Sequence, residues 1–154
     1  NINVTNIDEA VEYIDKYFET YSDVKKYMDE NVEKAKRDGY ITTLFGRRRV
    51  INELKSSNYN VRSFGERAAM NMPLQGSSAD IIKIAMINVY KKLNECNLRA
   101  RLVLQVHDEL VIDCPEEEKD IVSGILKIEM ENAVALKVPL TVEVGCGKNW
   151  FAAK

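Results

Sequence analysis

The sequence predicts an α+β fold that combines helices with a small antiparallel sheet. Two β-rich runs, 100–106 and 110–114, flank a short polar segment, which is the pattern of a β-hairpin. Apolar residues recur at helical spacing in several other stretches. With 154 residues, 45% of them hydrophobic, the chain is long enough for one domain with a buried core.

A helical hairpin is expected in the first forty residues. Thr5 or Asn6 caps a first helix over 7–21, whose apolar positions have amphipathic spacing: Ile7, Val11, Ile14 and Phe18. Ser22 caps a second helix to about residue 37, and Gly39 ends it. Four tyrosines are expected to pack between helices, with base stacking as the alternative: Tyr13, Tyr17, Tyr21 and Tyr27.

A basic segment follows a β-prone stretch at 40–45. Gly46 ends that stretch before three consecutive arginines, which cannot all face one ligand: Arg47, Arg48 and Arg49. Residues 41–67 carry six basic and two acidic side chains, whereas 108–131 carry two basic and nine acidic ones. The local balance of +4 predicts a phosphate-binding surface despite a formal net charge of -2. The alternative is an ordinary solvated surface.

Two helices separated by a proline are expected between residues 61 and 94. The polar stretch 51–60 predicts a loop before them. The first helix should end near Met72, because Pro73 lacks an amide donor and clashes with the preceding turn. The segment 77–80 resembles a capping box, and the apolar helix after it is expected to be the core helix under the sheet.

Three polar residues are spaced four apart in the first of these helices. Arg67, Asn71 and Gln75 would line one face of a continuous helix, although Pro73 interrupts the spacing before Gln75. Their side chains suit hydrogen bonds to the minor groove and the sugars of a duplex. A polar helix face in contact with water is the alternative.

The hairpin carries the candidate metal ligands at its bend. Alternation predicts that the first strand turns Leu102, Leu104 and Val106 to one face. His107 precedes Asp108 and Glu109, and a divalent cation is one physical reason to place adjacent carboxylates in a tight turn. A solvated turn is the alternative, because aspartate is a common turn residue.

The C-terminal part predicts a helix and a last strand. Pro115 precedes a helix over about 116–134, whose first acidic residues form a solvated face. An apolar stripe is expected at Ile121, Ile125, Ile128 and Val134. Residues 139–144 alternate like a strand, and Trp150 and Phe151 are expected to pack the tail down.

The remaining features favour a soluble cytoplasmic protein. Three widely spaced cysteines without a CxxC pair, Cys96, Cys114 and Cys146, favour reduced thiols over a zinc knuckle or a disulfide framework. The sequence lacks an apolar run of membrane-spanning length and an N-terminal signal pattern. Its first residue is asparagine, which suggests a fragment or a processed product.

Three motifs in order resemble family A DNA polymerases, those similar to bacterial DNA polymerase I. The segment 105–109, Gln-Val-His-Asp-Glu, is similar to the third conserved motif of the family. The segments 42–49 and 66–80 resemble the same family in the same order, as do 138–140 and 144–150 near the end. The likeness covers nearly the whole chain.

The resemblance implies template-directed transfer of deoxynucleotides to a primer 3′-hydroxyl, with two magnesium ions in the complete enzyme. Asp108 would bind metal, Glu109 would support the site and His107 would lie beside the primer end. Arg67, Asn71 and Gln75 match positions that contact primer and template. The implied partners are primer-template DNA and deoxynucleoside triphosphates, in the cytoplasm beside the nucleoid.

The resemblance also implies a division of the chain and a missing part. Residues 1–75 resemble a helical and basic segment from the fingers, and 76–154 resemble the later half of the palm. The family's first-motif Asp and its nucleotide-binding helix have no counterpart before Asp108. We therefore expect the isolated chain to bind magnesium weakly and to lack polymerase activity.

Two other functions remain open. One is a self-sufficient nucleic-acid-binding module, in which the basic segment binds the duplex and Asp108 is only a turn residue. A metal-dependent nuclease built on Asp108 and Glu109 would need more metal ligands than the sequence provides.

Overall fold

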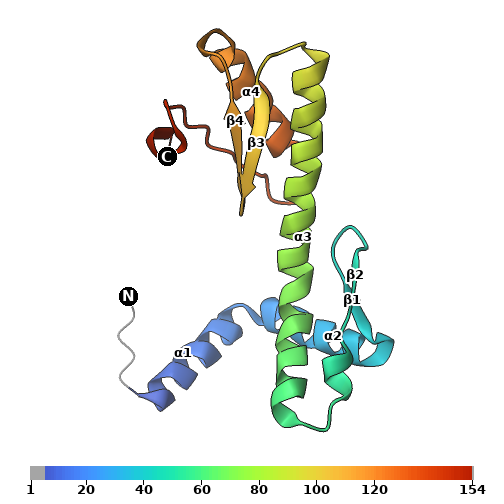
Figure 1. Ribbon diagram of the computed structural model, residues 1–154. Helices are drawn as coiled ribbons and strands as arrows, with labels where there is room; N and C mark the ends of the chain where they lie inside the picture. Colours follow the sequence, from blue (N-terminus) through green and yellow to red (C-terminus); the bar gives the residue numbers. More distant parts are fainter. Residues whose placement is uncertain (1–5, 154) are drawn as a thin grey trace. The chain divides into compact units, whose positions relative to one another are not determined.

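The computed structural model describes residues 6–153 and divides the chain into two compact units, Asn1–Ser77 and Ser78–Lys154. The described part is mostly helical with two separate two-stranded antiparallel sheets, which confirms the α+β class. Helix α3 (Tyr59–Glu95) contributes residues to both units (Figure 1). None of the helices among residues 6–153 combines the length and the apolar character needed to cross a membrane. Thr5, a candidate cap, lies outside the described residues.

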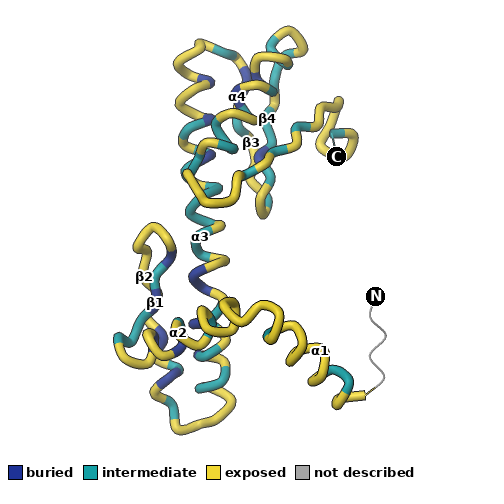
Figure 2. Tube along the Cα trace, turned by 180° about the vertical axis from the view of Figure 1, so that it is seen from behind, coloured by how far each residue is buried: buried dark blue, intermediate teal, exposed yellow. Residues whose placement is uncertain are grey.

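The two helices predicted before residue 40 are confirmed, but they do not form a hairpin: only Tyr21 separates them, and they follow one another end to end (Figure 1). One cap also differs from expectation. Helix α1 (Ile7–Thr20) begins where the Asn6 side chain accepts a hydrogen bond of 2.7 Å from the Glu9 amide. Helix α2 (Ser22–Asp38) ends at Gly39, which has φ 77°. The prediction that Ser22 is the cap was wrong, because the cap position is Tyr21 and no side chain fills it. Both helices have mostly exposed residues (Figure 2).

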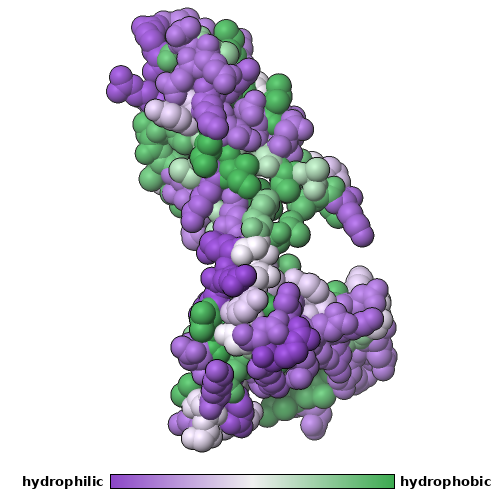
Figure 3. All heavy atoms as spheres, turned by 90° about the vertical axis from the view of Figure 1, so that its right-hand side faces the viewer, coloured by the Kyte–Doolittle hydropathy of each residue, from purple (hydrophilic) through white to green (hydrophobic). Residues whose placement is uncertain are grey.

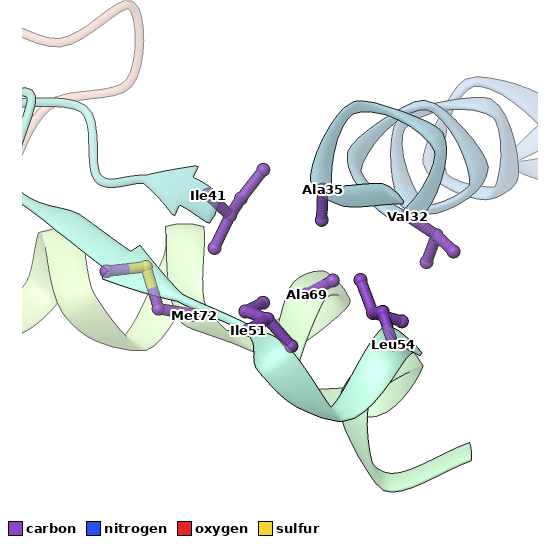
Figure 4. Close-up of a cluster of buried hydrophobic side chains, with 7 residues drawn as sticks. All are labelled: Val32, Ala35, Ile41, Ile51, Leu54, Ala69 and Met72. Carbon is purple, nitrogen blue, oxygen red and sulfur yellow. The ribbon is translucent and has the colours of Figure 1, made fainter. Parts of the chain in front are cut away.

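The core of the first unit lies between α2, a short hairpin and the N-terminal half of α3. The hairpin joins β1 (Tyr40–Thr42) to β2 (Arg48–Val50), and a 3-10 helix, η1 (Asn52–Lys55), follows it. Seven buried side chains from these elements and from the junction of β2 and η1 form one hydrophobic cluster (Figure 4): Val32, Ala35, Ile41, Ile51, Leu54, Ala69 and Met72. Strand β2 and η1 were missed, because their polar residues read as a loop.

Helix α3 does not break at Pro73, so the prediction of two helices was wrong. Pro73 removes one backbone hydrogen bond, which disfavours a helix locally. Tertiary contacts on both sides of Pro73 hold the helical path: Met72 is buried in the core, and the Leu44 amide donates to Ser77 Oγ at 2.8 Å. Packing therefore overrides the local preference of the proline.

The β1–β2 hairpin packs closely on α3 at a glycine. Arg47 Nη2 donates to the Gly76 carbonyl at 2.9 Å, and the Arg47 amide donates to Thr43 Oγ1 at 3.1 Å. A Cβ atom at position 76 would lie 2.6 Å from Cγ2 of Thr43, which is buried. This close approach requires a glycine at position 76.

The second unit is built on the C-terminal half of α3, with β3 (Arg101–Val106), β4 (Glu109–Asp113) and α4 (Lys119–Glu131) around it (Figure 1). The 3-10 helix η2 (Glu116–Glu118) immediately precedes α4, and a second one, η3 (Trp150–Ala153), ends the described chain. The buried cluster confirms the core role of this half of α3: Ala85, Val89, Leu93, Ala100, Leu110, Val122 and Ile125.

The β3–β4 hairpin is confirmed, but the predicted face of β3 was wrong. Leu102 pairs with Ile112 and Leu104 pairs with Val111, so Val103 is an extra residue in β3. A one-residue shift moves every following side chain to the other face of a sheet. Leu104 and Val106 therefore face away from Leu102, and Leu104 is exposed.

Expectations for the C-terminal part were wrong at four points. Of the predicted stripe, Ile125 is buried as expected, but Ile121 and Ile128 are 56% and 58% exposed, and Val122 packs on the core in their place. Residues 139–144 form no strand, since β3 and β4 pair only with each other. Phe151 is 91% exposed. Figure 3 shows hydrophobic side chains on the surface among the polar ones.

The fourth wrong expectation is that the acidic residues before α4 form only a solvated face. One of them, Glu118, also binds backbone amides. The Glu118 carboxylate accepts hydrogen bonds from the amides of Arg99 and Ala100, at 3.0 and 2.9 Å. Its side chain is only 13% exposed. Glu118 thus satisfies two backbone donors immediately before β3.

Gly76→Ala should destabilise the first unit by about 1–2 kcal/mol, because overpacking against Thr43 exceeds the gain in helix propensity. Gly124→Ala in α4 is the matched control, since nothing lies within 4 Å of a Cβ at that position. The control should stabilise its unit by about 0.5–1 kcal/mol. Urea unfolding measures both, and equal stabilisation by both substitutions would contradict the close approach at Gly76.

Candidate functional site

The candidate metal-binding residues occupy the tight turn of the second unit. Val106 pairs with Glu109, so His107 and Asp108 form a two-residue turn between the strands. His107 has φ 52°, in the left-handed region that two-residue hairpin turns use. The Gln105 side chain donates to the His107 carbonyl at 2.6 Å and supports the turn. His107 and Asp108 are exposed, as predicted, while Glu109 is half-buried at the start of β4.

This turn offers carboxylates to a cation but does not build a complete metal site. Among residues 6–153, no group of three or more His, Cys, Asp or Glu side chains is arranged to hold a metal ion. Magnesium is commonly held by one or two carboxylates together with substrate phosphates and water. Asp108, with Glu109 next to it, fits that role and leaves the other ligands to groups outside the described residues.

The polar face predicted in the first unit exists because α3 is continuous. Arg67, Asn71 and Gln75 all lie in α3 at intervals of four residues, and all three are exposed. Arg67 Nη1 donates to Ser63 Oγ, one turn earlier, at 2.9 Å. The face therefore presents amide and guanidinium groups in a row along one helix, which suits hydrogen bonds to the edge of a duplex.

The three arginines have different environments. Arg47 binds the Gly76 carbonyl and fixes the hairpin on α3. Arg48 lies over the ring of Tyr40, with its Cζ atom 4.8 Å from the ring centroid. Arg49 pairs with Ile41 in the ladder, on the face opposite to Arg48. All three residues are exposed. They do not form one cluster, which agrees with the expectation that three consecutive arginines cannot all face one ligand.

One contact near the turn was missed by sequence reasoning. Trp150 Nε1 donates to Glu109 Oε2 at 3.3 Å, across 41 residues of sequence. No periodicity or spacing relates a tail residue to a hairpin, so only the folded chain reveals this pair.

Burial also affects one cysteine that follows β4. It raises the pKa of the Cys114 thiol, with the neighbouring Cys146 as a smaller cause. Cys96, Cys114 and Cys146 are all free. The neutral form of Cys114 is favoured, and this makes the thiol a poor nucleophile.

Comparison with known proteins identifies the family. A family model described as DNA polymerase family A matches residues 1–152. The chain belongs to this family. One relative is DNA polymerase I from Caldicellulosiruptor bescii, which is 59% identical over 95% of this chain. Another is DNA polymerase I from Bacillus subtilis, which is 52% identical over all of it.

The solved structures support the same assignment for this family A chain. The POL domain of Pol1 from M. smegmatis, in a complex with DNA primer-template and dNTP, has a TM-score of 0.93 and 46% identity. That match covers 96% of this chain and 26% of the POL-domain chain. The chain spans 17% of the length of the C. bescii and B. subtilis proteins.

Proposed function

We propose that the chain is part of a DNA-directed DNA polymerase, which transfers deoxynucleotides from their triphosphates to a primer 3′-hydroxyl on a template, in DNA replication and repair. Membership of the family, over residues 1–152, is the observation that carries the proposal. The M. smegmatis relative, whose structure holds DNA primer-template and dNTP, supports the choice of partners. A location in the cytoplasm, beside the nucleoid, follows from the substrate.

Asp108 is the proposed metal ligand in this chain, and Glu109 supports it. When bound, two magnesium ions would activate the attacking hydroxyl and stabilise charge on the departing pyrophosphate. The exposed position of Asp108 in the two-residue turn allows its carboxylate to reach a cation without a buried charge. His107 would lie beside the primer end and position it.

The proposed role of the first unit is to bind primer-template DNA. Arg67, Asn71 and Gln75 would hydrogen-bond to the minor groove and to sugars. Arg48 and Arg49 would contact phosphates, while Arg47, which donates to the Gly76 carbonyl, would lie beside them at the DNA surface. In this proposal residues 1–75 derive from the fingers and 76–154 from the palm.

The isolated chain is proposed to be inactive. Its described residues supply one pair of sequence-adjacent carboxylates, and no group of three or more His, Cys, Asp or Glu side chains among them is arranged to hold a metal ion. Magnesium dehydrates reluctantly and is usually held by one or two carboxylates together with substrate phosphates, which the isolated chain does not supply. A further carboxylate and the nucleotide-binding groups would come from the part of the polymerase that precedes the matched region.

A non-catalytic DNA-binding module is the second candidate function. The balance of +4 over residues 41–67 favours it, because such a segment attracts any phosphate backbone. A module of this kind binds duplexes without regard to a primer end or to Asp108, which separates it from the polymerase.

Asp108→Asn in the complete polymerase should lower kcat by roughly 1,000-fold or more, because a lost metal ligand removes several kcal/mol of transition-state stabilisation. Folding should change little, since Asp108 is exposed. Asp113→Asn, at the exposed end of β4, is the matched control and should keep normal turnover. Single-turnover primer extension measures both, and equal rates for the two variants would remove Asp108 from the site.

Arg67→Ala in the same polymerase should weaken primer-template binding by about tenfold, since one hydrogen bond from a charged group contributes roughly 1.4 kcal/mol. The loss should be similar across sequences, because contacts in the minor groove read shape more than base identity. Lys34→Ala removes one charge from exposed α2 and serves as the control. Fluorescence anisotropy measures the affinities, and a loss no greater than that of the control excludes a contact by Arg67.

A further inference from the structure

We propose that Trp150 is a positioning residue, whose indole N–H holds the Glu109 carboxylate beside Asp108. This inference rests on the proposed function, because it gives Glu109 a fixed place in the polymerase site. Its direct basis is the hydrogen bond of 3.3 Å from Trp150 Nε1 to Glu109 Oε2. An N–H group that donates to a carboxylate forms a charge-assisted bond, which is stronger than one between neutral groups.

The C-terminal segment is folded so that Trp150 reaches the turn. Asn149 closes the 3-10 turn of η3: its carbonyl accepts from the amides of Ala152 and Ala153, and its side chain accepts from Ala152 at 2.9 Å. The turn folds back on residues 145–147. A Cβ at Gly147 would lie 2.6 Å from the carbonyl carbon of Ala152, and a Cβ at Gly145 would clash with the Ala153 carbonyl.

Gly145 and Gly147 therefore help to place Trp150, because they allow the terminal turn to lie against residues 145–147. Any side chain at position 145 or 147 would push the terminal turn away from the segment on which it folds. Trp150 is the first residue of that turn, so its ring would move with it. The segment 145–150 is held in a shape that presents the indole N–H to β4.

Glu109 needs a partner of this kind for a physical reason. It follows Asp108 directly, and two neighbouring carboxylates repel each other. A glutamate also has three side-chain torsions, and each donor to its carboxylate restricts them. Trp150 supplies one such donor from a distant part of the chain.

The structural test uses a property of the sequence: the chain contains one tryptophan. Its ¹H–¹⁵N spectrum therefore has a single indole cross-peak, which reports on the surroundings of the Trp150 N–H without overlap. Glu109→Gln should shift the indole proton upfield, because the acceptor loses its charge. Asp108→Asn and the exposed Glu143→Gln are the controls and should shift it much less.

An indole shift that is the same in Glu109→Gln and in the two controls would overturn the contact. This readout does not depend on catalysis, so it decides the contact even if the complete protein makes no DNA. A failure of synthesis by the unmodified complete protein would count against the proposed function instead.

The functional test places Trp150→Phe in the complete polymerase, which keeps an aromatic ring and removes the N–H donor. Loss of a residue that orients a metal-site group should lower kcat by about tenfold. KM for the nucleotide and affinity for primer-template should stay unchanged, because Trp150 is proposed to act through Glu109.

A merely structural role predicts a different pattern, in which Trp150→Phe lowers the unfolding midpoint and leaves kcat unchanged. That pattern would overturn the positioning role. A double variant with Glu109→Gln separates the alternatives further: if Trp150 acts through Glu109, adding Trp150→Phe to Glu109→Gln should have little additional effect on kcat.

Discussion

The close approach of neighbouring elements to helix α3 is the constraint on which both units depend. In the first unit, a Cβ at Gly65 would lie 3.0 Å from the Leu54 amide nitrogen, Ala69 is fully buried, and Gly76 lies against Thr43. In the second, the small side chain of Ala85 is buried in the core. Small side chains at these positions let a strand, a 3-10 helix or a second helix approach the backbone of α3. The same contacts carry the helix through Pro73 and give Arg67, Asn71 and Gln75 their common face.

The parts predicted correctly are those whose signal is local. Gly39 ends α2 because a left-handed residue is needed there, and the β3–β4 hairpin is evident from two apolar runs around a polar turn. The errors arise where contacts with residues distant in the sequence determine the local structure. Neither the continuity of α3 at Pro73 nor the extra residue at Val103 has a local signature, because both follow from packing and pairing with other segments.

The candidate site shows the same division. The sequence located the turn of Asp108 and the polar residues of α3, but it predicted a break at Pro73 before Gln75 that the structure does not have. The sequence did not predict the different contacts of the arginines. Arg47 donates a hydrogen bond to the Gly76 carbonyl, and Arg48 lies over the Tyr40 ring. The contact of Trp150 with Glu109 was equally invisible, although it is the interaction that links the end of the described chain to the turn. In this account the fold fixes the polymerase residues in two units, and catalysis requires ligands that these units do not contain.

The most direct test of that claim is primer extension on a recessed template with magnesium and four deoxynucleotides, by this chain and by a version extended N-terminally in the source gene. The account predicts no synthesis by the chain and Asp108-dependent synthesis by the extended protein, because magnesium needs further carboxylates and the substrate phosphates together. Asp108-dependent synthesis by the chain alone would contradict it, since a second metal ligand and a nucleotide site would then lie within these residues.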